Sequence, residues 1–179
     1  VYVAKTLERY VDGFELNLSC PHAKGYGMQL GQDPAVVFEI TRTVVRNSKI
    51  PVFAKLTPNA SNIGEIAKAA VNAGAQGIVA INTVGPGCHM IDGYEVLTNK
   101  FGGLSGRAIT PIGVKCVRDI RQAVGPDVFI LGMGGIFNAN DVRNYLRFVN
   151  GVGIGSYFIG KTDDEIRKSL FILRSDLEN

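Results

Sequence analysis

The sequence lacks any uncharged apolar run long enough to cross a membrane. Its longest uncharged stretch, residues 69–91, contains Asn72, Gln76, Asn82, Pro86 and several glycines, whereas a spanning helix needs about 20 predominantly apolar residues. No transmembrane helix is therefore expected. The first residues also lack an initiator methionine, a basic segment and a small-residue cleavage site, so they do not read as a signal peptide.

The sequence also has little net charge and few cysteines. Its net charge is +3, with 46% hydrophobic and 20% charged residues, which excludes a disordered chain and a nucleic-acid binder with a strong basic stripe. Cys20, Cys88 and Cys116 include no C-x-x-C pair for zinc or an iron–sulfur cluster. We expect one soluble domain over residues 1–179 in a reducing cytoplasm, with no metal and with neither nucleic acid nor membrane as a partner.

Five short apolar runs alternate with helical patterns along the chain. The runs are apolar on both faces, which is typical of buried parallel strands, and they occupy residues 13–18, 51–56, 77–82, 128–133 and 151–155. Apolar residues at helical spacing predict helices over 34–47, 62–73, 111–124, 140–148 and 163–177. This alternation predicts an α/β fold with a parallel sheet.

Polar residues and glycines collect at the carboxyl ends of these strands, where a (β/α)8 TIM barrel places its site. They are Asn17, Lys55, Asn82, the pair Gly134 and Gly135, and the pair Gly155 and Ser156. A complete barrel usually needs about 250 residues. Five strand–helix units in 179 residues therefore predict the C-terminal portion of a barrel, its strands four to eight, incomplete as it stands.

Two residues near the first strand ends could carry chemistry. Cys20 lies between Asn17 and His22 on a loop, where a thiol can act as a nucleophile or transfer a proton, the alternative being a small apolar filler. Lys55 lies within an apolar strand, where an ammonium group is costly to bury without a partner. It could be a Schiff-base lysine of an aldolase or lyase barrel, a cation that stabilises charge on a cofactor, or a side chain reaching out to water.

The second half of the chain adds binding groups. Asn82, next to Thr83, offers a carboxamide that both donates and accepts, which suits a ring with N–H and C=O groups. Glycine clusters occupy residues 102–106, 132–135 and 151–156, and the last two predict a phosphate site at the ends of strands seven and eight. None has the G-x-G-x-x-G spacing, which disfavours a Rossmann dinucleotide site.

Two other groups are expected to be surface features. Cys88 and His89 lie in a segment rich in glycine and proline, which indicates a surface loop. Lys115, Arg118 and Arg121 lie at helical spacing and are expected to form a solvated helix face.

Five segments resemble, in order, successive motifs of the dihydroorotate dehydrogenase family, and they run through nearly the whole chain. They are ELNLSCP at 15–21, AKLTPN at 54–59, INT at 81–83, GGLSG at 102–106 and GGI at 134–136. Members of this family are FMN-containing barrels that oxidise dihydroorotate to orotate in pyrimidine (UMP) biosynthesis. The cysteine at position 20 is similar to the soluble class; the membrane-associated class carries serine there.

The resemblance implies a role for each matching residue. Cys20 would be the base that removes the C5 proton of dihydroorotate, while hydride leaves C6 for the flavin. Substrate would be held by Asn17, Asn82 and Thr83. Lys55 would lie at the pyrimidine edge of the flavin, and four of the glycine-cluster residues would bind its phosphate. The full cofactor-binding set would be Asn17, Lys55, Ile81, Gly106, Gly134, Gly135, Gly155 and Ser156.

Some features leave alternatives open. His22 stands where many members have asparagine, and its segment also resembles the pyrimidine-reducing domain of dihydropyrimidine dehydrogenase, so dihydrouracil is the alternative substrate. The segment 85–101 is more similar to the soluble archaeal and bacterial dihydroorotate dehydrogenases, and this resemblance favours dihydroorotate. A non-catalytic barrel remnant that binds only a phosphate ligand or a partner chain is a third interpretation.

The resemblance also bears on partners. Soluble members pass electrons to fumarate, or to NAD through a partner subunit with FAD and an iron–sulfur cluster, and homodimers are a family expectation. The family's first three strands have no counterpart before Val1. We therefore expect this chain alone neither to close a barrel nor to turn over substrate.

Overall fold

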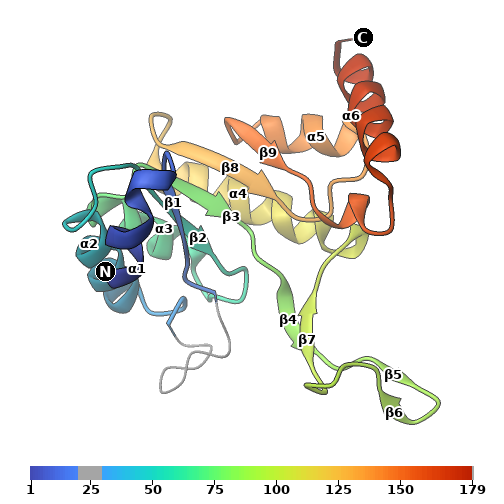
Figure 1. The fold of residues 1–179 in the computed structure, drawn as a ribbon, viewed down its shortest axis with the longest axis horizontal. Helices are drawn as coiled ribbons and strands as arrows, with labels where there is room; N and C mark the ends of the chain where they lie inside the picture. Colours follow the sequence, from blue (N-terminus) through green and yellow to red (C-terminus); the bar gives the residue numbers. More distant parts are fainter. Residues whose placement is uncertain (20–29, 179) are drawn as a thin grey trace.

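The computed structural model describes residues 1–19 and 30–178, and its centre is a five-stranded parallel sheet (Figure 1). The strands pair in the order β1 (Phe14–Asn17), β2 (Val52–Leu56), β3 (Gly77–Ala80), β8 (Phe129–Met133) and β9 (Gly151–Gly153). All five predicted strands are confirmed, with bounds slightly shorter than predicted. Sequential parallel strands joined by helices are the expected product of the strand–helix alternation.

The five predicted helices are also present. They are α2 (Pro34–Val45), α3 (Ile63–Asn72), α4 (Thr110–Val124), α5 (Ala139–Leu146) and α6 (Asp163–Glu178). The side chains of Asp33, Asn62 and Asn138 cap three of them by accepting backbone N–H groups of the first turn. The sequence analysis did not predict α1 (Tyr2–Leu7) or the short 3-10 helices η1 (Glu8–Tyr10), η3 (Arg107–Ile109) and η4 (Ser156–Phe158).

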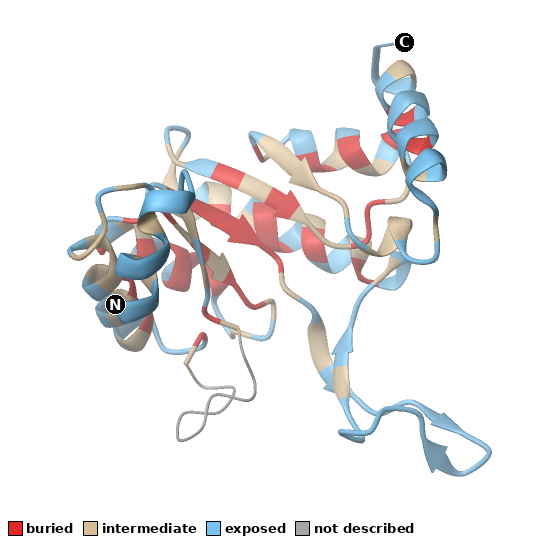
Figure 2. Ribbon diagram, in the orientation of Figure 1, coloured by how far each residue is buried: buried red, intermediate tan, exposed pale blue. Residues whose placement is uncertain are grey.

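The helices pack on one face of the sheet, and the residues on the opposite face are less buried. In β2, Val52, Ala54 and Leu56 are buried, while Phe53 and Lys55 on the opposite face are half-buried. Helices α2 and α3 contact β2, α4 contacts β3 and β8, and α5 contacts β9. The buried core therefore lies between the sheet and this helix layer (Figure 2).

The sheet formed by the described residues is open. Strands β1 and β9 are its edges, and each pairs with a single neighbour. A parallel sheet with helices on one face is the arrangement of a barrel wall. The structure thus has the form of part of a barrel, as predicted.

A β-rich arm projects from the body between β3 and α4 (Figure 1). It consists of β4 (Val84–Gly87) paired with β7 (Gly102–Leu104), and β5 (Met90–Ile91) paired with β6 (Tyr94–Glu95), both antiparallel. The predicted surface position of Cys88 and His89 is confirmed, since both are exposed on this arm. Its strands were not predicted, because glycine and proline obscure the alternation of so short a hairpin.

The prediction that the basic residues of α4 form a solvated face is wrong at Arg121. The side chains of Lys115 and Arg118 are 63% and 51% exposed, as predicted. The Arg121 guanidinium instead donates hydrogen bonds to four backbone carbonyls and one amide oxygen. These acceptors belong to Gly125, Pro126, Val128, Phe148 and Asn150. Helical spacing could not predict these hydrogen bonds, because the acceptors lie in segments that follow α4 in the sequence.

The described residues contain neither a membrane-spanning helix nor a cluster of metal ligands. None of their helices has the length and apolar character needed to span a membrane. Their His, Cys, Asp and Glu side chains form no group of three or more that could hold a metal ion.

Candidate active site

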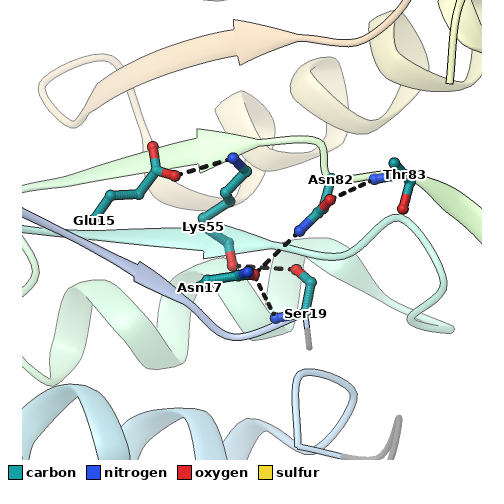
Figure 3. Close-up of polar contacts among 6 residues, drawn as sticks. All are labelled: Glu15, Asn17, Ser19, Lys55, Asn82 and Thr83. Carbon is teal, nitrogen blue, oxygen red and sulfur yellow. Dashed lines mark hydrogen bonds and ion pairs between the residues drawn. The ribbon is translucent and has the colours of Figure 1, made fainter. Parts of the chain in front are cut away.

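The carboxyl ends of β1 and β3 bring the predicted substrate-binding residues together (Figure 3). The Nδ2 of Asn82 donates to the Oδ1 of Asn17 over 3.1 Å, and the Oδ1 of Asn82 accepts the Thr83 N–H at 2.8 Å. The Oδ1 of Asn17 also accepts the N–H of Ser19 at 3.2 Å. These shared hydrogen bonds orient both carboxamides at one edge of the sheet.

Lys55 projects from β2 on the face that the helices leave open, and it pairs with Glu15 of β1. Its Nζ lies 3.0 Å from Glu15 Oε1, with the two side chains 22% and 41% exposed. The carboxylate offsets the cost of placing an ammonium group within an apolar strand. Glu15 was not among the predicted site residues, although its position two residues before Asn17 places both on the same face of β1.

A cavity of about 280 Å³ lies over the ends of β3, β8 and β9. Its volume is close to the lower limit of small-molecule sites, about 300 Å³. Most of the predicted cofactor-binding residues line it, together with two of the substrate-binding residues: Lys55, Ile81, Asn82, Thr83, Gly134, Gly135, Gly155 and Ser156. Ser105, Met133 and Phe137 also line the cavity and were not predicted. Asn17 and Gly106 are not in its lining, although Asn17 bonds to Asn82.

The backbone after β8 forms a turn suited to an anion. Gly134 and Gly135 have φ angles of 122° and 73°, which glycine tolerates and other residues rarely adopt. A Cβ on Gly135 would lie 2.4 Å from Thr110 Oγ1, so no side chain fits there. Within the described part of the chain, the N–H groups of Gly135 and Ile136 donate to no acceptor. Unpaired backbone donors in the lining of a cavity suit a phosphate group.

A smaller cavity of about 70 Å³ adjoins this site and shares Thr83 with it. Its lining includes Ser19, Thr57 and Asn59, together with Phe101 of the arm. The sequence analysis gave Thr57 and Asn59 no role, although both lie in a segment, 54–59, that carries the family resemblance.

Two residues of the sequence analysis cannot be placed in this site. The predicted base, Cys20, and the neighbouring His22 lie outside the described residues. The last described residue before them, Ser19, lines the smaller cavity.

The sequence profile of the family described as dihydroorotate dehydrogenase matches residues 1–159. The dihydroorotate dehydrogenase B (NAD(+)) catalytic subunit of Methanocaldococcus jannaschii is 50% identical over 173 residues, covering 92% of this chain and 56% of that protein. The catalytic subunit of the same name from Pyrococcus abyssi is 46% identical over 148 residues, covering 81% and 48%. The chain thus spans about half the length of the curated relatives it matches.

Solved structures agree on the fold. The crystal structure of DHODH in complex with ferulenol from Eimeria tenella matches with a TM-score of 0.70 and 20% identity, over 98% of this chain and 56% of that one. The ligand-free form matches with a TM-score of 0.71 and 21% identity, over 96% and 52%. At such identities these two structures support the fold alone, and this chain corresponds to about half of it. Because the family profile covers most of the residues, the chain belongs to the dihydroorotate dehydrogenase family.

Proposed function

We propose that this chain carries part of the site of an FMN-dependent enzyme that oxidises dihydroorotate to orotate in pyrimidine biosynthesis. The observation that carries the proposal is the convergence of two kinds of group around one cavity. Asn82, which is hydrogen-bonded to Asn17, lines the cavity, and so does the turn at Gly134 and Gly135. Membership of the family supports the same conclusion.

The residues lining the cavity fit FMN in our proposal. The unpaired N–H groups of Gly135 and Ile136 suit its phosphate, with Gly155 and Ser156 also lining this region. Lys55 also lines the cavity, and a cation there favours negative charge on the pyrimidine edge of the flavin ring. When bound, FMN would supply the hydride acceptor.

The substrate role follows from the amide groups. Carboxamides both donate and accept hydrogen bonds, so Asn17 and Asn82 match the N–H and C=O groups of a dihydropyrimidine ring, with Thr83 as a further polar contact. In the proposed reaction, Cys20 takes the proton from C5, hydride leaves C6, and a C5–C6 double bond forms. A thiol is suited to this step because its ordinary pKa of about 8.5 is within reach of neutral pH.

Partners are also part of the proposal. The curated relatives are named NAD(+)-type catalytic subunits, which favours NAD over fumarate as the final electron acceptor. We propose an electron-transfer subunit with FAD and an iron–sulfur cluster as the partner of the whole protein. We further propose a homodimer of the catalytic chain and a cytoplasmic location.

The proposal is tested on the protein at its full natural length, by following its visible flavin spectrum without oxygen. Dihydroorotate should bleach the flavin, and Cys20→Ser should slow bleaching by about 10²-fold or more, because a lost general base costs that much. Cys88→Ser is the matched control, since Cys88 is exposed on the arm, and it should bleach like the wild type.

Other outcomes would contradict the proposal. Bleaching by dihydrouracil alone would move the protein to the dihydropyrimidine dehydrogenase reaction. Absence of flavin, with a substrate carbonyl trapped on Lys55 by borohydride, would favour the Schiff-base lyase. Equal bleaching rates in Cys20→Ser and wild type would remove Cys20 as the base.

A further inference from the structure

Tyr145 reaches from α5 through the core to the glycine turn. Its side chain is fully buried, and its hydroxyl donates to the Gly134 carbonyl at 2.7 Å, with the Met133 carbonyl at 3.3 Å. Burial raises the pKa of the Tyr145 phenol above its ordinary value. The hydroxyl therefore keeps its proton at neutral pH and acts as a donor to the turn.

Two glycines on other elements make room for this side chain. A Cβ on Gly113 of α4 would lie 1.8 Å from the Tyr145 hydroxyl oxygen, and a Cβ on Gly132 of β8 would lie 2.7 Å from its ring. Glycine inside a helix costs about 1 kcal/mol relative to alanine. Gly113 therefore lowers the stability of α4, and it leaves the space that the Tyr145 hydroxyl occupies.

A second hydroxyl holds the next carbonyl of the same turn. Thr110 Oγ1 lies 2.6 Å from the Gly135 carbonyl oxygen and 2.8 Å from that of Arg107, with Gly135 the nearer acceptor. In a trans peptide the C=O and the following N–H point in opposite directions. The carbonyls of Gly134 and Gly135 point toward the hydroxyls that bond to them. The N–H groups of the same two peptides, those of Gly135 and Ile136, therefore point away from these hydroxyls. These are two of the unpaired donors of the cavity lining.

We propose that Tyr145, with Thr110, is a positioning residue that fixes the phosphate-binding N–H groups of the Gly134–Gly135 turn. It does not touch the cofactor, and it acts through the backbone carbonyls that it holds. The inference rests on the proposed function, because it takes the ligand phosphate to be that of FMN. It goes beyond that function because it proposes that a hydroxyl buried in the core strengthens binding of the phosphate.

The test compares dissociation constants for FMN and riboflavin, which lacks the phosphate, in the apoprotein at full natural length. Tyr145→Phe removes only the hydroxyl, and it should weaken FMN about 3- to 10-fold, the equivalent of one neutral hydrogen bond, while riboflavin binding stays unchanged. A role in packing alone would weaken both ligands equally. Thr41→Val is the control, since it removes a buried hydroxyl without a partner in the described structure, and it should change neither constant.

Further variants keep the result interpretable. Gly113→Ala should lower the FMN preference in the same direction by displacing the hydroxyl. If Tyr145→Phe does not fold, Thr110→Val takes its place, and it should also lower the preference. An unchanged ratio of the two constants in the folded variant overturns the inference and leaves the proposed function standing. A wild-type protein that binds neither flavin overturns the proposed function itself.

Discussion

The side chain of Arg121 offers the most stringent test of the fold, because a single guanidinium joins three parts of the chain. It links α4, the loop that follows it and the turn before β9. The donor–acceptor distances are 2.8 Å to Phe148, 2.7 Å to Gly125, 3.1 Å to Pro126, 2.8 Å to Val128 and 2.8 Å to Asn150. Asn150 Oδ1 also accepts the N–H of Ile130, at 2.9 Å, which extends the network into β8.

The magnitude follows from these bonds and from the partial exposure of the residue. A hydrogen bond to a charged group contributes about 1.5–3 kcal/mol to the free energy of unfolding. Adding this contribution for every acceptor of Arg121 would give a large loss of stability on substitution. Residue 121 is only half-buried, and water can replace part of the lost bonding. We therefore expect Arg121→Met to lower the free energy of unfolding by about 2–4 kcal/mol, within the range for a broken hydrogen-bond network.

The assay is urea unfolding of the protein at full natural length, followed by circular dichroism. Arg118→Met on the same helix is the matched control. Its side chain is 51% exposed and pairs with the neighbouring Asp119, so it should change the unfolding free energy by less than about 0.5 kcal/mol. Equal unfolding midpoints for the two variants, at equal urea dependence, would refute the role given to Arg121.

Three further predictions concern single residues. Asn138→Ala removes a capping box of α5, and thermal unfolding should show a loss of about 1 kcal/mol; an unchanged melting temperature would contradict the cap. Burial raises the pKa of the Cys116 thiol, so its contribution to stability is complete below the unfolded-state pKa of about 8.5 and is lost as pH rises above it; Cys116→Ala should show a shallower alkaline decline in urea midpoint, and mass spectrometry should find Cys88 alkylated before Cys116. Glu15→Gln should alter the unfolding free energy by less than about 1 kcal/mol, because its pair with Lys55 is partly exposed; a much larger loss in urea would mean that the pair is buried in the whole protein.

The sequence predicted the sheet and its helices well because their signals are local. Runs that are apolar on both faces marked β2 and β3, and apolar residues at helical spacing marked α2. The strands of the arm between β3 and α4 were not predicted, because they are short and contain glycine and proline. The exposed side chains of the arm also lack the apolar alternation that a half-buried strand shows.

The candidate site was predicted where it depends on position along strands, and missed where it depends on contacts between distant elements. Strand ends placed Lys55 and Asn82 in one cavity lining. No pattern in the sequence indicated that Glu15 would pair with Lys55, or that Tyr145 would reach the carbonyl of Gly134. These contacts join residues 40 and 11 positions apart, and they follow from the register of the sheet and the packing of α5.

The most direct test of the central claim is an experimental structure of the protein at full natural length with FMN bound. We expect the phosphate within hydrogen-bonding distance of the Gly135 and Ile136 N–H groups, and the pyrimidine edge of the flavin beside Lys55. A phosphate bound elsewhere, or a flavin ring lying over the Gly134–Gly135 turn, would contradict this claim.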